Sequence, residues 1–262
     1  MQAMKIGFAL NEALALATVI TGALALLWRW HRRRGHAHKP WWAHWGADLF
    51  TVVALMFGCR VALADWMHVP SGSMEPTLRV GDVLLINHLA YGPRLPFTNT
   101  ALPMGEPTRG DVVVFRHPSN PSQFLVKRVV GVPGDRVVFD RGVVAVNGDD
   151  LAVSPHAASD RAEDKEHLLL HESLGGRRHA IKLSAFYGQG VPMTVGEPHC
   201  ARASRAQWQC TVPPDTLLML GDNRDHSADS RVFGFVPMTE VYGRVDRVLL
   251  NTREWSRFWT AL

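Results

Sequence analysis

The chain opens with a long hydrophobic segment that carries no charge. Ala13–Trp28 is a run of sixteen uncharged residues, and the apolar residues Ile6–Leu10 extend it toward the N-terminus past Asn11 and Glu12. This length is close to the ~20 residues that an α-helix needs to cross a bilayer. The basic run Arg29–Lys39 follows the segment, whereas a cleaved signal peptide carries its charges first. We therefore expect a retained membrane-spanning helix over about residues 6–28.

A second hydrophobic segment, Leu49–Cys59, follows the basic run. Its eleven uncharged residues alone would suit a buried or interfacial helix, but extension in both directions gives a spanning length over about residues 43–64. Arg60 then lies close enough to one end to reach the membrane surface. By the positive-inside rule the basic loop 29–42 stays in the cytoplasm and the rest of the chain lies outside. Tryptophans flank both segments, as at membrane interfaces, so the sequence predicts a membrane anchor over residues 1–66.

From Val80 onward the pattern changes to short β-branched runs separated by turn residues, which is typical of an all-β domain. The runs are Val83–Ile86, Val112–Phe115, Leu125–Val130, Val137–Val146, Thr216–Leu220 and Val241–Leu250. Between residues 154 and 210 the sequence is more polar, and two runs around a Leu-Gly-Gly turn, His167–Ser173 and Arg178–Ser184, predict a hairpin. We expect a β domain over 67–153 and 211–262 with a small inserted β subdomain over 154–210. The aromatic tail Trp255–Leu262 packs on the body or on the membrane.

Charge and cysteine content narrow the range of partners. A net charge of +4 and a pI near 9.2 would suit nucleic acid, but much of the excess charge lies in the loop 29–42, so no nucleic acid is expected. Three cysteines are too few and too scattered for a zinc module. Outside the membrane, Cys200 and Cys210 could form a disulfide or stay as two free thiols, and the sequence leaves both open. Cys59 lies in the apolar segment.

The first residues suited to chemistry form the loop Val69–Leu78, which reads Val-Pro-Ser-Gly-Ser-Met-Glu-Pro-Thr-Leu. Its two prolines restrict the backbone, and Gly72 allows a bend between the two serines. A loop this stiff can hold a serine hydroxyl and nearby backbone N–H groups in fixed relation. An ordinary polar turn would have the same composition, so the loop alone does not indicate a catalytic site and has to be judged with the rest of the chain.

The second candidate is a lysine in a chain that strongly prefers arginine, with 23 arginines and five lysines. Lys127 lies between the apolar Leu125 and Val129 on one face of a predicted strand, and Arg128 points to the other face. Apolar surroundings lower the pKa of a lysine from ~10.4, and the neutral amine can take a proton from a serine. Arginine stays protonated and cannot do this. The alternative is a lysine at a strand edge, facing water.

The third candidate is the polar segment Gly221–Arg231, which follows an apolar strand and is rich in aspartate and arginine. Pairs between these side chains could hold the segment rigid, with Ser227 or Ser230 positioned to orient a neighbouring group. On its own the pattern predicts a structured polar loop. None of the thirteen histidines lies in a comparably ordered motif, which disfavours a Ser-His-Asp hydrolase.

Together the three segments resemble bacterial signal peptidase I, in its Gram-negative form with two N-terminal spans. The family pattern Pro-Ser-Gly-Ser-Met-x-Pro-Thr-Leu is present at Pro70–Leu78, and Lys-Arg-x-x-Gly-x-Pro-Gly-Asp is present at Lys127–Asp135. The pattern Gly-Asp-Asn-Arg-Asp-x-Ser-x-Asp-Ser-Arg is present at Gly221–Arg231. Three long motifs in the correct order are highly specific, whereas residues 154–210 have no obvious match.

The resemblance implies a serine endopeptidase with a signal-peptidase-like, mainly β catalytic domain behind two transmembrane helices. It would remove signal peptides from exported preproteins at the outer, periplasmic face of the bacterial cytoplasmic membrane. In the matching positions, Ser73 is the nucleophile, Lys127 is the general base, and Ser71 joins the Ser73 N–H in the oxyanion hole. Ser227 would orient Lys127. Structural support is expected from the pairs Asp229 with Arg231 and Asp222 with Arg128.

The family cleaves after a small-x-small motif, so apolar walls are expected near the nucleophile. The matching positions are Val69, Pro70, Met74, Leu78, Leu125 and Val126 near the scissile bond, with Leu84 and Val114 further out. Leu125 stands where well-known members carry an aromatic residue, which implies an altered pocket. The expected partners are exported preproteins and membrane lipid, and no cofactor is expected. The alternatives are a peptidase dedicated to one export system, a self-cleaving regulator and a non-catalytic membrane-anchored binding protein.

Overall fold

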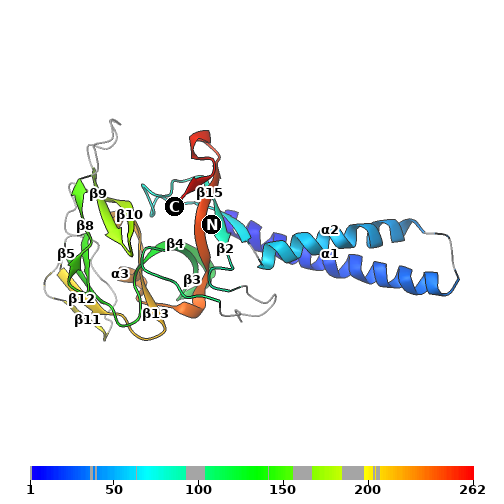
Figure 1. Ribbon diagram of the computed structural model, residues 1–262, viewed down its shortest axis with the longest axis horizontal. Coiled ribbons are helices and arrows are strands. Elements are labelled where there is room, and N and C mark those ends of the chain that lie inside the picture. Colours follow the sequence, from blue (N-terminus) through cyan, green and yellow to red (C-terminus); the bar gives the residue numbers. More distant parts are fainter. Residues whose placement is uncertain are drawn as a thin grey trace.

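A helical hairpin extends from one side of a β body in this computed structural model (Figure 1). The two helices are α1, Gln2–Arg33, and α2, Trp41–Ala62. Gly46 allows them to approach closely, because a Cβ at this position would lie 2.2 Å from Leu24 Cβ. The structure describes residues 2–35, 38, 40–62, 64–92, 104–140, 142–155, 167–184, 198–202, 204 and 207–262.

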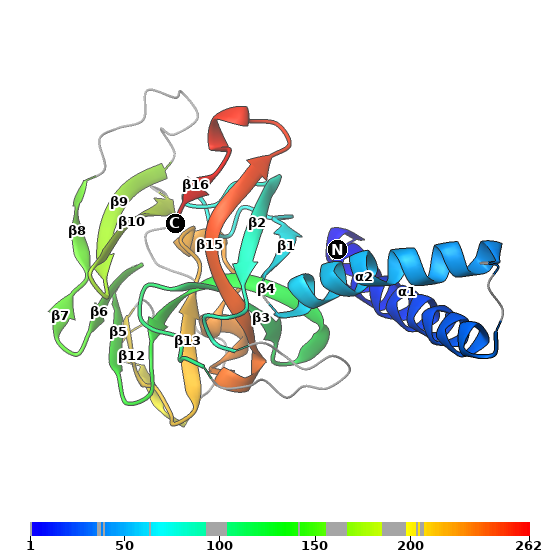
Figure 2. The ribbon, with the colours of Figure 1, turned by 45° about the vertical axis from the view of Figure 1, so that its right-hand side comes forward.

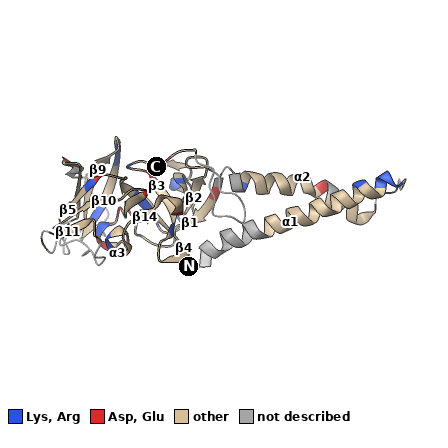
Figure 3. Cartoon of the chain, turned by 90° about the horizontal axis from the view of Figure 1, so that it is seen from below, with Lys and Arg blue, Asp and Glu red and all other residues tan. Residues whose placement is uncertain are grey.

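Among the described residues, Ala13–Arg33 is the one helical stretch long and apolar enough to cross a membrane, in agreement with the first predicted span. The second predicted span, 43–64, is helical over most of its length as part of α2, and its passage through a membrane stays a prediction. Basic residues lie at the tip of the hairpin, away from the β body (Figure 3). The apolar side chains of α1 that point outward are Leu16, Val19, Ile20, Leu26 and Leu27.

The end of α2 differs from the prediction that Arg60 reaches out to a membrane surface. Arg60 is buried, with its guanidinium 2.7 Å from the Asp65 carboxylate and stacked 4.1 Å from the centre of the Trp66 ring. Both partners belong to β1, Ala64–His68, which begins almost directly after α2 and so brings them within reach. The ion pair and the stacked ring join the helical hairpin to the β body.

The largest sheet is antiparallel and places strands that are distant in the sequence side by side (Figure 2). Its order is β1-β2-β15-β3-β4-β13-β14, and β16 pairs with β15. Every strand predicted in this part of the sequence is present. The bounds are β2 Asp82–Asn87, β3 Val112–His117, β4 Asn120–Gly131, β13 Thr216–Leu220, β14 Val236–Pro237, β15 Val241–Asn251 and β16 Thr260–Ala261.

Both faces of this sheet are covered near β3, which explains its unbroken apolar sequence. Val112 and Val114 belong to one buried cluster, whereas Val113 and Phe115 belong to another. Successive side chains of a strand point to opposite faces, so a strand between two apolar layers needs apolar residues at every position. The tight packing around β3 gives the neighbouring β4 a rigid support.

Two smaller sheets make up the rest of the body. A five-stranded sheet has the order β11-β12-β5-β6-β7, and a three-stranded sheet has the order β10-β9-β8. Their bounds are β5 Arg136–Asp140, β6 Val143–Val146, β7 Asp149–Asp150, β8 Ala152–Pro155, β9 His167–Leu174, β10 Arg177–Ser184, β11 Cys200–Arg202 and β12 Gln207–Thr211. The short helices are η2 Arg224–His226, α3 Ser230–Phe233, η3 Met238–Glu240 and η4 Trp255–Arg257.

These sheets divide the chain differently from the predicted boundary at residue 154. Strands β5–β7, predicted within the larger domain, share a sheet with β12, where Val137 lies opposite Cys210. This pairing joins segments some seventy residues apart, and no local pattern encodes it. The run predicted as one strand over 137–146 is two strands, with Gly142 between them at a φ of 87°. The predicted hairpin of β9 and β10 is present.

Cys200 and Cys210 form a disulfide, so the alternative of two free thiols is wrong. The two residues lie opposite each other on β11 and β12. The aromatic tail pairs with the body through β16, while the side chains of Trp255, Phe258 and Trp259 remain exposed. Within the predicted insert, residues 156–166 and 185–197 lie outside the described part of the chain.

Candidate active site

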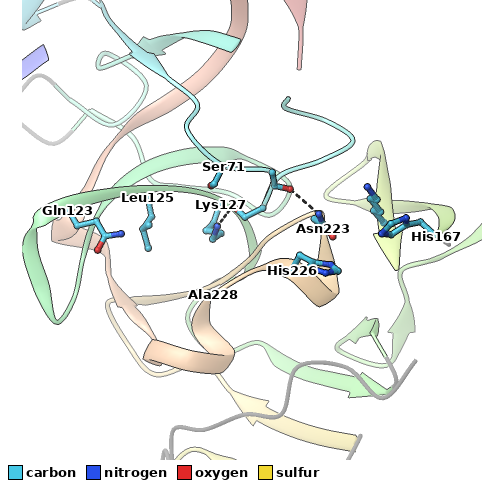
Figure 4. Close-up of a pocket in the computed structure, with 11 residues that line it drawn as sticks. Ser71, Gln123, Leu125, Lys127, His167, Asn223, His226 and Ala228 are labelled. Carbon is cyan, nitrogen blue, oxygen red and sulfur yellow. Dashed lines mark hydrogen bonds between the residues drawn. The ribbon is translucent and has the colours of Figure 1, made fainter. Parts of the chain in front are cut away.

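The three segments singled out from the sequence meet at one place on the β body (Figure 4). The loop 69–78 is tied to the start of β2, because Val69 N–H donates to the Asp82 carbonyl at 2.8 Å and Gly81 N–H donates to the Val69 carbonyl at 3.0 Å. The buried Met74 and Leu78 fasten the loop to the apolar cluster beneath it. The serines between these two anchors are thereby held over β4.

Lys127 of β4 points at Ser73. Its Nζ donates a hydrogen bond of 2.5 Å to Ser73 Oγ, and the lysine is only 3% exposed. Burial lowers the pKa of Lys127 to about 8, since the ammonium loses its hydration. The carboxylates of Asp229 and Asp222 oppose this shift, and Arg231 adds to it. A lysine with such a pKa exists partly as the neutral amine near neutral pH, next to a hydroxyl from which it can take a proton.

Arg128, the next residue of β4, lies on the other face and is fully engaged. Its Nε and Nη2 donate to the two carboxylate oxygens of Asp222 at 2.8 and 2.6 Å, and its Nη1 donates to the Gly110 carbonyl at 2.9 Å. Burial would raise the pKa of Asp222, but Arg128 and the Thr77 hydroxyl hold it below its usual range. The predicted pair of Asp222 with Arg128 is therefore formed, and it links the segment 221–231 to β4.

The predicted pair of Asp229 with Arg231 is also formed. Arg231 Nε and Nη2 donate to the Asp229 carboxylate at 2.8 Å each, and the Gly221 N–H donates to the same carboxylate at 3.0 Å. Burial would raise the pKa of Asp229, whereas the guanidinium and these hydrogen bonds lower it. Arg231 also donates to the Arg224 carbonyl at 2.6 Å, so the segment closes on itself.

Ser227 does not make the predicted contact with Lys127. Its Oγ is buried, and no hydrogen bond joins it to the lysine within the described structure. The hydroxyl lies beside the Asp229 carboxylate and helps to lower its pKa. It also lies against Gly221, where a Cβ would come within 2.2 Å of Ser227 Oγ and 2.4 Å of the Ser73 carbonyl. Glycine is required here because two elements of the site approach its backbone this closely.

The site opens into a cavity of about 490 Å³ that runs past the serine and the lysine. Of the eight side chains predicted to bind substrate, only Leu125 lines it; Pro70 is exposed. The others pack in the apolar cluster beneath the loop: Val69, Met74, Leu78, Leu84, Val114 and Val126. An apolar pattern identifies residues that avoid water but does not separate a pocket wall from the core behind it. The full lining is Ser71, Gly72, Ser73, Gln123, Leu125, Lys127, His167, Lys182, Asn223, His226 and Ala228.

Several of these lining residues were not predicted from the sequence. His226 occupies the variable position just before Ser227 in the third motif. Lys182 and His167 come from β10 and β9, which carry no family motif, although the scarcity of lysine would have singled out Lys182. Among the described residues, no group of three histidine, cysteine, aspartate or glutamate side chains is placed to hold a metal ion.

The sequence is similar to one known protein family and to several of its members. Residues 42–250 match the family model described as signal peptidase, peptidase S26. Signal peptidase I from Pseudomonas aeruginosa is 35% identical, and the match covers 81% of this chain and 74% of that protein. Signal peptidase I from Haemophilus influenzae is 30% identical, with 82% of this chain and 74% of that protein covered. A crystal structure of a signal peptidase I from Enterococcus faecalis is 25% identical and has a TM-score of 0.32, with 53% and 97% of the two chains covered.

Proposed function

The chain belongs to the signal peptidase family of serine endopeptidases, which remove signal peptides from preproteins, and we propose that Ser73 is its nucleophile and Lys127 its general base. The hydrogen bond of 2.5 Å between Lys127 Nζ and Ser73 Oγ supports this assignment best. A buried lysine with a pKa of about 8 meets the demand on a base that must release and accept a proton under physiological conditions.

In the proposed reaction the neutral amine of Lys127 takes the hydroxyl proton as Ser73 Oγ attacks the carbonyl carbon of the scissile bond. The oxyanion that forms accepts hydrogen bonds from the Ser71 hydroxyl and the Ser73 N–H, a type of stabilisation typically worth ~3 kcal/mol for each donor. The Lys127 ammonium then gives its proton to the departing amine, and an acyl-enzyme on Ser73 remains. Lys127 activates a water molecule in the same way to release the acyl group.

The surroundings of the pair would keep the base in place. Asp229 with Arg231 and Asp222 with Arg128 hold the segment 221–231 against the site, and we assign Ser227 to the same supporting shell. Side chains before the cleaved bond would lie at the Leu125 end of the cavity, where a small-x-small motif fits beside an apolar wall.

We further propose that α1 and α2 both cross the cytoplasmic membrane, with the basic loop 29–42 inside and the β body on the periplasmic side. The exposed aromatic side chains of Trp255, Phe258 and Trp259 would then contact lipid at the outer surface. A signal peptide leaves the bilayer at that surface, so its cleavage point would meet the site. Protease treatment of intact spheroplasts checks this topology, because the β body should be digested and the loop protected.

The catalytic assignment is tested by cleavage of a purified preprotein with Ser73→Ala, Lys127→Ala and Lys127→Arg. All three should lose processing, and Lys127→Arg is the informative control because it retains the positive charge but cannot act as a base. Each variant should still insert into membranes and fold. Substantial cleavage by Ser73→Ala would show that another group is the nucleophile.

A further inference from the structure

Two of the five lysines in the chain line the same cavity, although arginine carries most of the positive charge elsewhere. The proposed reaction gives Lys127 a role but gives Lys182 none. Lys182 lies in the middle of β10, and the cavity at this end is also lined by His167 at the start of β9 and His226 of η2. The two imidazole rings lie 6.2 Å apart. A lysine and two histidines therefore converge beyond the nucleophile.

Lys182 is held in a defined position relative to Ser73. Its backbone N–H donates to the Asp222 carbonyl at 2.8 Å, and Lys182 pairs with Asn223 in an isolated parallel β-bridge. Asn223 in turn donates from its backbone N–H to the Ser73 carbonyl at 3.1 Å and from Nδ2 to the Gly72 carbonyl at 3.0 Å. These contacts make β10 part of the framework that carries the nucleophile, so the position of the lysine is set by the site itself.

The ammonium of Lys182 already faces a carboxylate. Its Nζ lies 3.4 Å from Glu75 Oε2, and the two side chains are 17% and 32% exposed. A single contact of 3.4 Å between partly exposed side chains is a weak ion pair, so a second carboxylate can compete with Glu75 for the ammonium. The carboxylate of the nearby Asp225 binds the backbone instead, since its Oδ2 accepts a hydrogen bond of 2.7 Å from the Ser184 N–H.

We propose that Lys182, together with His167 and His226, forms a subsite for an acidic side chain that follows the cleaved bond. This rests on the proposed function, which places the residues before the bond beside Leu125. Leu125 and Gln123 lie at one end of the cavity, Lys127 lies between, and His226 and His167 lie at the other end (Figure 4). A peptide bound across Ser73 therefore carries the first residues of the mature chain toward Lys182. The subsite makes an acidic mature N-terminus a favoured substrate.

The proposal is tested with peptides that differ only at the first three positions after the cleaved bond, each carrying glutamate, glutamine or lysine in turn. An ion pair between partly exposed groups changes kcat/KM by up to about fivefold. A lysine in the peptide would in addition be repelled by Lys182. At one of the three positions, kcat/KM should therefore be about tenfold higher for the glutamate peptide than for the lysine peptide. Lys182→Met should bring this ratio close to one, whereas Lys182→Arg should keep it. Because both peptides are measured with the same variant, a general loss of activity does not change the ratio.

Glu75→Gln supplies a second variant, because it removes the carboxylate that competes for Lys182. The preference for glutamate should then increase severalfold over that of the unmodified enzyme. No preference at any of the three positions, or the same preference in Lys182→Met, would overturn the subsite. Neither result depends on which residue is the nucleophile. Cleavage by Ser73→Ala would overturn the proposed function, but the ratio of kcat/KM for glutamate over lysine peptides could still be measured.

Discussion

Lys127 and Arg128 are neighbours on β4 and both are buried, at 3% and 4% exposure, yet their surroundings are opposite. Arg128 shares two hydrogen bonds with the Asp222 carboxylate. Lys127 has a hydroxyl partner, Ser73 Oγ, and no ion pair of Lys127 is found in the described part of the chain. Strand alternation sends the two side chains to different faces, one against a carboxylate and the other into the cavity.

The difference shows that burial alone does not decide what a cation does. A paired buried guanidinium stays charged and holds two segments together. An unpaired buried ammonium has a lowered pKa and becomes available for proton transfer, at some cost to the folded state. The two residues should therefore respond in opposite ways when their charge is removed.

The largest effect is expected for Lys127→Met. Preprotein cleavage should fall by at least about 10³-fold, because the general base is lost. The free energy of unfolding at pH 7 should stay the same or increase, since the substitution replaces a buried unpaired cation with an apolar side chain of similar length. Cleavage assays and denaturant unfolding of the same preparation measure both. A marked loss of stability would mean that Lys127 is a structural residue.

Arg128→Met should have the opposite profile. It leaves the buried Asp222 carboxylate without its partner, and breaking such a pair typically costs ~3–5 kcal/mol of unfolding free energy. The double variant Arg128→Met with Asp222→Asn is the matched control, because it removes the stranded charge and should recover part of the loss. Equal stability of the single and double variants would argue that the pair is not what holds the segment 221–231.

Gly221→Ala tests how closely the two sides of the site must approach. The added Cβ would meet Ser227 Oγ and the Ser73 carbonyl, so Ser73 must move away from Lys127. A shift of this kind should lower kcat/KM by about 10- to 100-fold. Gly58→Ala in α2 is the control, because among the described residues no atom outside the backbone of its own helix lies within 4 Å of its Cβ position. Unchanged cleavage by Gly221→Ala would show that the site tolerates the displacement.

The contrast on β4 was predictable from the sequence because it depends on local rules. Strand alternation separates Lys127 from Arg128. Most strands followed from their β-branched runs for the same reason. The pairing of Ser73 with Lys127, by contrast, was implied by the resemblance of the three motifs to signal peptidase I. Long-range pairing carries no such local signal, and so the partnership of β5 with β12 and the entry of β9 and β10 into the site could not be predicted.

The sequence also could not decide which partner a given polar side chain contacts. Ser227 was expected to orient Lys127, but the structure places it beside Asp229 and not in hydrogen-bonding contact with Lys127. Arg60 was expected to reach the membrane surface, but it pairs with Asp65. In both cases the choice depends on a few ångströms of backbone position, which residue types alone do not determine.

The smallest effect expected is the pH dependence, and it examines Lys127 without changing any residue. The proposed reactive form of Lys127 is the neutral amine, which makes up half of the population at its pKa of about 8 and nearly all of it about one pH unit higher. Cleavage should therefore increase by about tenfold between pH 7 and pH 9 and then level off. Initial rates on one preprotein across this range check the prediction, and activity that falls over the same range would contradict a lysine base.

The same pKa makes a linked prediction for stability. The folded-state pKa of Lys127 lies below the value of ~10.4 in the unfolded chain, so between these values the unfolded state binds more protons. Stability therefore gains as pH rises through this window, and the cost of the buried charge is fully present below about pH 8. Comparison with Lys127→Met isolates this contribution from other titrating groups, since the difference in unfolding free energy between the two proteins should shrink from pH 7 to pH 10. Arg128→Met leaves Lys127 in the chain, so the dependence on pH should persist in that variant.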